Sequence, residues 1–145
     1  MLRSIMNGLI GAVTLTVAHQ VLRNQVADAP KMDKLGEEGV ENLFEKLGRP
    51  APTGKSLTYL ALAGDIALNT LYYSQVGSSR GVGAVAKGLS LGLGAGLGTA
   101  KLPSFLGFSK DATEQTPRQT AMTVGLYVLG GVAAAMAAQS CKKKK

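Results

Sequence analysis

The chain lacks tryptophan, and it has only one cysteine and one histidine among its 145 residues. Cys141 alone cannot form an internal disulfide or a cysteine-based metal cluster. His19 alone removes zinc sites and most other metal sites that need two histidines. Charged residues are scarce as well, at 17% against the usual quarter. Because these charges are clustered, long stretches of the chain are almost uncharged.

Sequence motifs for catalysis and cofactor binding are also sparse. The glycine-rich stretch 88–98 has neither the preceding strand nor the Gly-Lys-Ser/Thr ending of a phosphate-binding loop. No His-Glu-x-x-His pair is present, and Cys141 has no orienting base beside it. The sequence therefore predicts no catalytic residue, no metal and no cofactor, and an enzyme is the less favoured class.

The net charge of +7 comes largely from the four final lysines, Lys142, Lys143, Lys144 and Lys145. No aromatic residues are interleaved with basic ones, as a base-stacking surface would need, so nucleic acid is not a predicted partner. A lysine run beside an apolar helix is typical of a helix end held at an anionic membrane surface. The lipid bilayer is therefore the predicted partner.

Four stretches predict transmembrane helices, at about 5–22, 57–76, 82–106 and 120–138. The first is expected to be a retained span and not a cleaved signal peptide, because Ala18-His19-Gln20 is a poor small-x-small cleavage site. The third alternates Leu and Gly like a strand, but an isolated strand cannot satisfy its backbone in lipid. We therefore expect one all-α membrane domain over residues 1–145, an integral four-helix bundle.

The polar segment 24–56 contains one predicted amphipathic helix, from Asp33 to Leu47. Asp33 is expected to cap its start and Gly48 to end it. Its apolar stripe consists of Leu35, Val40, Leu43, Phe44 and Leu47. Such a helix could lie on the membrane surface or cover the bundle end, and a solvated loop helix is an equal alternative.

The ends of the later spans also carry signals. Pro103 is expected to end or kink the third span. Residues 107–119 form a polar connection, and Thr116 is expected to cap the fourth span with Pro117 at its first position. The basic tail 141–145 follows that span.

Asp65 is the strongest candidate for a functional residue. Inserting an acidic side chain at the middle of a membrane helix costs about 2.5–3.5 kcal/mol, so the side chain should face protein or water. Thr58, Asn69 and Tyr72 fall on the same helix face. The stripe is either a proton, ion or substrate site, or a hydrogen-bond cluster that fixes the bundle. His19 is the natural partner of Asp65 for a proton relay, or else a hydrogen-bonding residue at the interface.

Glycines at four-residue spacing predict close helix packing, in the manner of a glycine zipper. The candidate packing residues are Gly88, Gly92, Gly96, Gly130 and Gly131, and a second ladder is formed by Gly94 and Gly98. This excess of small residues predicts a homo-oligomer or membership of a larger membrane complex.

Several short strings resemble a group of uncharacterised small bacterial membrane proteins with four spans. They are 28–33 (DAPKMD), 63–65 (AGD), 71–74 (LYYS), 119–123 (QTAMT) and 130–131 (GG). The resemblance covers most of the chain and implies a bacterial inner-membrane location. That group supplies no functional residues that could be carried over.

These observations leave three classes of function. A structural or accessory membrane component is preferred, because the chain is short and carries no reaction motif. The alternative is a small oligomeric transporter or channel that uses the polar stripe around Asp65. A lipid-modifying enzyme ranks last. Basic residues near the span ends are almost balanced between the two sides, and the lysine tail tips the prediction towards cytoplasmic termini.

Overall fold

The computed structural model describes residues 1–77 and 79–140. The predicted surface lysines Lys142–Lys145 and Cys141 lie outside these residues. The described chain is all-helical and has no strand, which confirms the all-α part of the predicted fold class. Its helices are α1 (Leu2–Gln25), α2 (Met32–Lys46), α3 (Lys55–Tyr73), α4 (Gly81–Phe105), α5 (Lys110–Thr113) and α6 (Pro117–Ser140), with the 3-10 helix η1 (Ser74–Val76) after α3.

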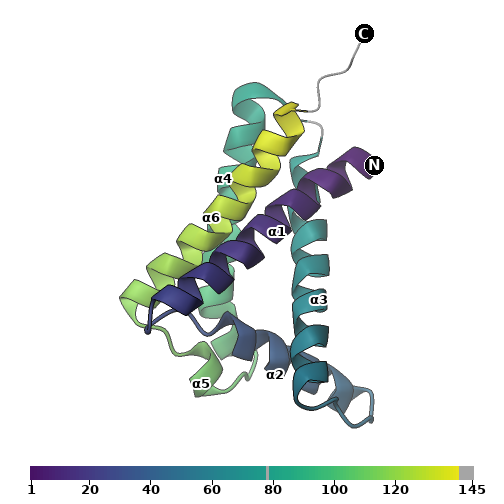
Figure 1. The fold of residues 1–145 in the computed structure, drawn as a ribbon, viewed down its shortest axis with the longest axis vertical. Helices are drawn as coiled ribbons and strands as arrows, with labels where there is room; N and C mark the ends of the chain where they lie inside the picture. The colour runs from purple at the N-terminus through teal and green to yellow at the C-terminus, as the bar shows by residue number, and fades with distance from the viewer. Residues whose placement is uncertain (78, 141–145) are drawn as a thin grey trace.

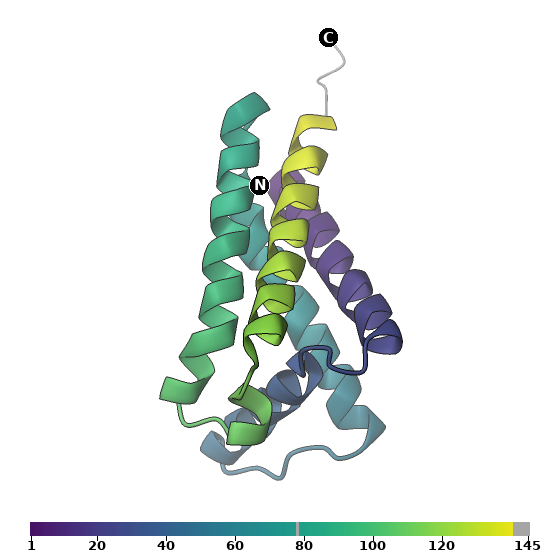
Figure 2. The same cartoon turned by 90° about the vertical axis from the view of Figure 1, so that its left-hand side faces the viewer.

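The four long helices run between the same two ends of the molecule (Figures 1 and 2). One end holds the start of α1, the turn between α3 and α4, and the end of α6, while α2 and α5 lie at the other end. Helix α4 packs along α6, α6 packs on α1, and α1 packs on α3, whereas α3 and α4 barely meet. The helices therefore form an open array in the order α3–α1–α6–α4.

Among the described residues, two helices are long and apolar enough to cross a membrane, and these are α1 and α6. Helix α4 is longer than either, but it contains Lys87, Lys101 and many glycines. Glycine adds length without adding hydrophobicity. Length and composition therefore support two candidate membrane-crossing helices.

The side chains are distributed in the opposite way to those of a soluble helical bundle. The packed interior contains small residues, among them Gly8, Gly11, Ala12, Ala84, Gly88, Gly92, Ala134 and Ala135. Large apolar side chains point outward instead, among them Leu9, Val17, Leu68, Leu71, Leu93, Leu97 and Met136. Water would penalise so continuous an apolar exterior, and close helix packing through small residues is typical of proteins in lipid.

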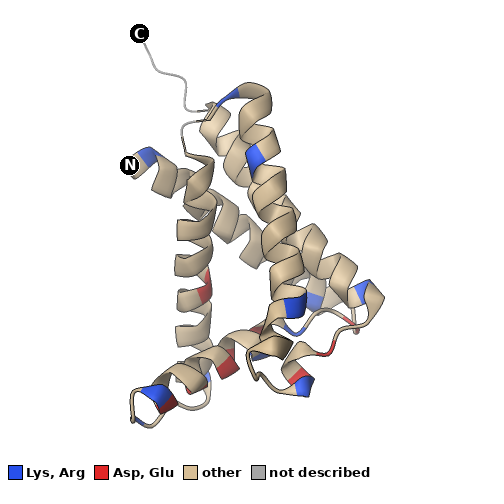
Figure 3. Ribbon diagram, turned by 180° about the vertical axis from the view of Figure 1, so that it is seen from behind, with Lys and Arg blue, Asp and Glu red and all other residues tan. Residues whose placement is uncertain are grey.

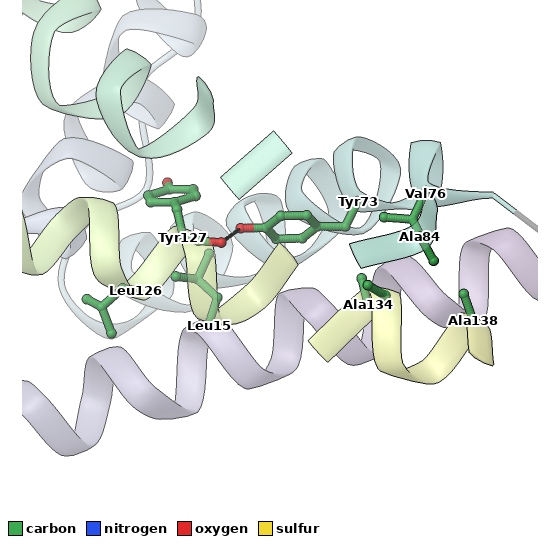
Figure 4. Packing of buried hydrophobic residues seen from close by; sticks show 9 residues of the cluster. Leu15, Tyr73, Val76, Ala84, Leu126, Tyr127, Ala134 and Ala138 are labelled. Atoms are coloured by element: carbon green, nitrogen blue, oxygen red, sulfur yellow. Dashed lines mark hydrogen bonds between the residues drawn. The ribbon is translucent and has the colours of Figure 1, made fainter. Parts of the chain in front are cut away.

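One large side chain, Tyr73, fills the centre of this small-residue interior (Figure 4). It extends from the end of α3 between α1, α4 and α6, and its hydroxyl donates a 2.7 Å hydrogen bond to the Tyr127 carbonyl oxygen on α6. Leu15 of α1 and Val76 of η1 are fully buried beside it. The phenol therefore joins α3 to α6, two helices that otherwise meet little.

The first glycine ladder lies against α6. A Cβ atom placed on Gly92 would lie 2.5 Å from the Val128 Cα atom, and one on Gly96 would lie 2.7 Å from the Val124 Cα atom. Gly88 is so close to Gly131 that neither residue has room for a side chain. These contacts let the α4 and α6 backbones approach each other directly, as small residues at this spacing permit.

The second glycine ladder, Gly94 and Gly98, faces away from α6. A Cβ on Gly94 would meet only the Tyr72 hydroxyl, at 3.4 Å, and one on Gly98 would meet only Leu102 of its own helix, at 3.5 Å. Both glycines line an open groove of about 370 Å³ between α3 and α4. The two ladders therefore have different surroundings, one covered and one open.

The predicted cap of the amphipathic helix by Asp33 is wrong. Helix α2 begins one residue earlier, its N-cap is Lys31, and no side chain caps it. The Asp33 carboxylate instead forms a 2.8 Å ion pair with Arg23 at the end of α1. The predicted stop is correct, because Gly48 has a φ of 63° and the Arg49 amide closes the helix end on the Phe44 carbonyl oxygen, at 3.0 Å.

The start of α6 is capped as predicted. The Thr116 hydroxyl accepts a hydrogen bond from the Gln119 amide at 3.2 Å, and the Gln119 side chain accepts one from the Thr116 amide at 2.9 Å. This reciprocal pair is a capping box. The polar connection before it also contains a short helix that the sequence did not predict, α5, which the Ser109 hydroxyl caps.

Candidate functional site

A partly open cavity of about 70 Å³ lies between α1, α2 and α3. Its polar and charged lining residues are Thr16, His19, Gln20, Arg23, Asp33, Glu37, Thr58 and Asp65, and the remaining lining is apolar. A cavity needs roughly 10–15 Å³ by this kind of measure to hold one water, so this one has room for several waters or a small ligand. It brings together two predicted candidates, His19 and Asp65, from different helices.

Asp65 is half-buried in the middle of α3. Its Oδ1 atom accepts a 2.9 Å hydrogen bond from the Asn69 side-chain amide, which also bonds the Asp65 backbone carbonyl at 3.0 Å. These two residues are therefore paired, as their i, i+4 spacing suggests. Tyr72 is not part of this pair, because its hydroxyl donates to the Leu91 carbonyl oxygen of α4 at 3.0 Å.

His19 is buried, with 6% of its surface exposed. Its Nε2 atom lies 3.1 Å from the carbonyl oxygen of Pro30, a fully buried residue in the connection between α1 and α2. Among the described residues no hydrogen bond joins His19 to Asp65, so the two candidates share a cavity without direct contact.

The charges around the cavity do not balance. Arg23 is already paired with Asp33, at 2.8 Å. Glu37 accepts a 2.6 Å hydrogen bond from the Thr58 hydroxyl, and Asp65 has its amide partner. Within residues 1–77 and 79–140, no basic side chain forms a salt bridge with either of these two carboxylates. The cavity is therefore rich in hydrogen-bond acceptors and carries excess negative charge.

Helix α2 forms one wall of the cavity. Acidic and basic residues of α2 and α5 lie at the same end of the array (Figure 3). Lys31 donates a 2.7 Å hydrogen bond to Asp111 of α5, and Lys34 bonds the other oxygen of the same carboxylate. These lysines hold the pKa of Asp111 at about 2. Glu38 accepts hydrogen bonds from the Ser109 amide and hydroxyl, at 2.5 and 2.7 Å. Helix α2 therefore covers one end of the array, although Leu43 and Leu47 remain exposed.

Sequence reasoning missed Glu37 and Thr16 as site residues. Glu37 has the pattern of an ordinary solvated residue on the polar face of α2, and only the docking of α2 brings it to the cavity. The Thr16 hydroxyl is buried without a hydrogen-bond partner among the described residues. The sequence pattern that could have identified Thr16 is its position three residues before His19, which places both residues on the same face of α1.

Residues 88–92 (GLSLG) match the Gly-x-Ser-x-Gly letters of a hydrolase nucleophile elbow, so the expectation that the sequence contains no such motif is wrong as to the letters. The structure places them within α4, where Ser90 is exposed. An elbow requires a sharp strand-to-helix turn, and a continuous helix provides none. This match therefore does not indicate a hydrolase.

Among the described residues, no group of three His, Cys, Asp or Glu side chains is arranged to hold a metal ion. The chain matches no protein-family model, no curated protein and no solved structure. Function is therefore argued from the cavity, the exterior and the helix packing.

Proposed function

We propose that the chain is a four-span integral protein of the bacterial inner membrane with a structural or accessory role. The observation that carries this proposal is the outward orientation of large apolar side chains on all four long helices, around an interior of glycine and alanine. In water that arrangement would expose the side chains that most need burial. In lipid it places them against acyl chains.

The lengths and charges of α3 and α4 support their role as spans. At 1.5 Å per residue, the 19 residues of α3 and 25 residues of α4 rise about 28 and 38 Å, close to or above the hydrocarbon thickness of about 30 Å. Every acidic residue except Asp65 falls within 28–45 or 111–114, at the end of the array that holds α2 and α5. Lys87 and Lys101 can extend along α4 towards the headgroups.

The accessory role rests on the open face between α3 and α4. The groove there is lined by Tyr72 of α3, by Leu35 of α2 and by α4 residues that include Gly94, Gly98 and Leu102, and α3 and α4 make few contacts with each other. A glycine face of this kind permits close approach of another transmembrane helix, from a second copy or from a larger complex. Association through this face would complete the packing that the open array leaves unfinished.

Membrane fractionation followed by carbonate extraction tests the integral location. We expect the chain to stay in the pellet after carbonate and to enter solution only with detergent. A chain that is folded and monodisperse in detergent-free buffer would contradict the proposal.

A matched pair of glycine variants tests the accessory role. Gly94→Leu should reduce the size of the assembly purified in mild detergent, because the new side chain fills the open groove. Gly125→Leu is the control, since a Cβ at Gly125 meets no atom within 4 Å and Gly125 lies on α6, outside the residues that line the groove. Equal assembly sizes for both variants and the unmodified chain would remove the α3–α4 face from the proposal.

A small transporter remains a second candidate, because the polar cavity places Asp65 where water can reach it. It predicts that Asp65→Asn abolishes a flux into proteoliposomes while the fold stays intact. A variant that keeps the flux but loses thermal stability in detergent would show that the acid is structural.

A further inference from the structure

The cavity between α1, α2 and α3 contains two carboxylates that form no salt bridge with a basic side chain of the described residues, because Arg23, which also lines it, is paired with Asp33. The carboxylates of Asp65 and Glu37 have neutral hydrogen-bond partners and no basic partner among the described residues. The Thr16 hydroxyl is buried and unpaired within the described chain. His19 lines the same cavity, and its Nε2 atom lies 3.1 Å from the Pro30 carbonyl oxygen.

These acceptors come from three different elements and from different kinds of group. The unpaired threonine hydroxyl is independent of the carboxylates, and a buried polar atom without a partner carries a cost of about 1–3 kcal/mol. A ligand that donates hydrogen bonds would remove that cost. The acceptor set is therefore more than a cluster of acids, since it includes a buried hydroxyl in the same partly open cavity.

The size and chemistry of the cavity define the complementary ligand. It must be small, because the volume is about 70 Å³, and positively charged, because two carboxylates lack a cation. It must also donate several hydrogen bonds in different directions. Among the described residues a metal cluster geometry is absent, whereas an ammonium group donates through three or four N–H bonds without a fixed coordination geometry.

We propose that this cavity binds a protonated primary amine, with the three N–H donors of the ammonium group directed to the carboxylates of Asp65 and Glu37 and to the Thr16 hydroxyl. A free short-chain amine and the ethanolamine headgroup of a lipid carry the same chemistry. The apolar part of the lining, which includes Leu15 and Leu62, would contact the carbon attached to the ammonium. The inference rests on the cavity geometry, and it holds whether or not the chain supports a flux.

The single histidine makes the experiment direct. Because His19 is the only histidine in the chain, its ring signals in an NMR spectrum report on the cavity without assignment. Methylammonium chloride is titrated into the full chain in an amine-free detergent at fixed pH. We expect a saturable shift of the His19 signals, and no such shift with tetramethylammonium, which is charged but has no N–H donor.

Two variants and a control separate binding from folding. Asp65→Asn keeps the size of the side chain and should weaken methylammonium binding about tenfold or more, because a hydrogen bond to a charged group is worth about 1.5–3 kcal/mol. Glu37→Gln should also weaken it. Glu41→Gln, an exposed position one turn further along α2, should leave it unchanged. Circular dichroism and thermal midpoints establish that each variant is folded.

Lipid nanodiscs distinguish the two sources of the amine. If phosphatidylethanolamine shifts the His19 signals relative to phosphatidylcholine, and methylammonium then competes, the headgroup is the ligand. If both lipids give the same spectrum and methylammonium still binds, the ligand is a soluble amine. The proposal is overturned if methylammonium causes no saturable shift, if tetramethylammonium causes the same shift, or if folded Asp65→Asn and Glu37→Gln both bind like the unmodified chain. A flux assay that fails while methylammonium still binds would count against transport alone.

Discussion

Buried polar side chains hold the helices together one contact at a time. In lipid, apolar side chains provide little drive for helix association, so a hydrogen bond between helices matters more than an equivalent apolar contact. Tyr73 combines both kinds of contact, because its ring is buried in the core and its hydroxyl donates to the Tyr127 carbonyl. Asn7 acts similarly near the start of α1, where its side-chain amide donates to the Gly77 carbonyl at 3.1 Å.

Removing the Tyr73 hydroxyl tests how much this contact contributes. We expect Tyr73→Phe to lower the free energy of unfolding by about 0.6–1.7 kcal/mol, the range measured for hydrogen bonds between membrane helices, while the helical content is unchanged. Denaturation in mixed detergent micelles provides the measurement. Tyr59→Phe is the matched control, because Tyr59 is 68% exposed. An equal effect from both variants would show that the hydroxyl at position 73 has no special role.

The Asp111 carboxylate allows a second test, which measures how the contact between α2 and α5 depends on pH. Its pKa falls from 3.8 to about 2 because Lys31 and Lys34 bond it. A carboxylate with a lowered pKa stabilises the folded state above its unfolded pKa, and that contribution is lost as the pH falls through the folded pKa. The contact between α2 and α5 should therefore be constant above about pH 4 and should weaken between about pH 4 and 2. Amide exchange in residues 107–113 measures it, and Asp111→Asn should remove the pH dependence.

At the scale of the helix, the α4–α6 pair depends on backbone approach. Gly88 and Gly131 touch so closely that a methyl group on either would overlap the other carbonyl oxygen. Carbonyl oxygens of a helix cannot shift as a flexible side chain can. The two helices must therefore separate when either glycine gains a side chain.

A pair of single-methyl variants on α4 tests this dependence. Gly88→Ala should lower the thermal midpoint in detergent, with a cost of about 1–3 kcal/mol for overpacking. Gly83→Ala lies on the same helix where no atom is within 4 Å, and it should leave the midpoint unchanged or raise it, since alanine favours a helix by up to about 1 kcal/mol. A midpoint for Gly88→Ala that is unchanged or raised, like that expected for Gly83→Ala, would mean that helix propensity and not packing controls α4.

The sequence predicted helices well where local chemistry fixes them. The start of α6 follows from Thr116 and Pro117, whose effect is confined to one turn, and the end of α2 follows from the positive φ of Gly48. Asp33 misled the prediction because Arg23, ten residues away along the chain, captures its carboxylate. An ion pair across a loop leaves no periodic signal in the sequence.

The candidate site was predicted only in part, because some of its residues are identified by local sequence patterns and others by contacts between distant parts of the chain. An acid within an apolar stretch identified Asp65, and the spacing of Asn69 identified its partner. Glu37 could not be found in this way, because its role depends on where α2 docks. That docking is determined by contacts such as Glu38 with Ser109, which are separated by 71 positions in the chain.

For the whole molecule, the arrangement of the turns decides between two and four spans. The turn that joins α3 to α4 lies at the same end as the start of α1, and α2 lies at the opposite end (Figure 1). If all four long helices cross the bilayer, these two regions face different compartments. If only α1 and α6 cross it, the α3–α4 hairpin need not reach the second compartment.

Labelling of single introduced cysteines distinguishes four membrane-crossing helices from two. In a Cys141→Ser background, Leu47→Cys marks the α2 end, Arg80→Cys marks the α3–α4 turn, and Leu97→Cys marks the middle of α4. With cytoplasmic termini, a membrane-impermeant maleimide should label position 47 in intact spheroplasts, position 80 only after lysis, and position 97 in neither, because a thiol in the hydrocarbon layer is not ionised. The reverse order for 47 and 80 would invert the orientation while keeping four spans. If positions 47 and 80 were both labelled from the same side of the membrane, α3 and α4 would not cross it, because the turn that joins them would be on the same side as α2. Only α1 and α6 would then remain as membrane-crossing helices.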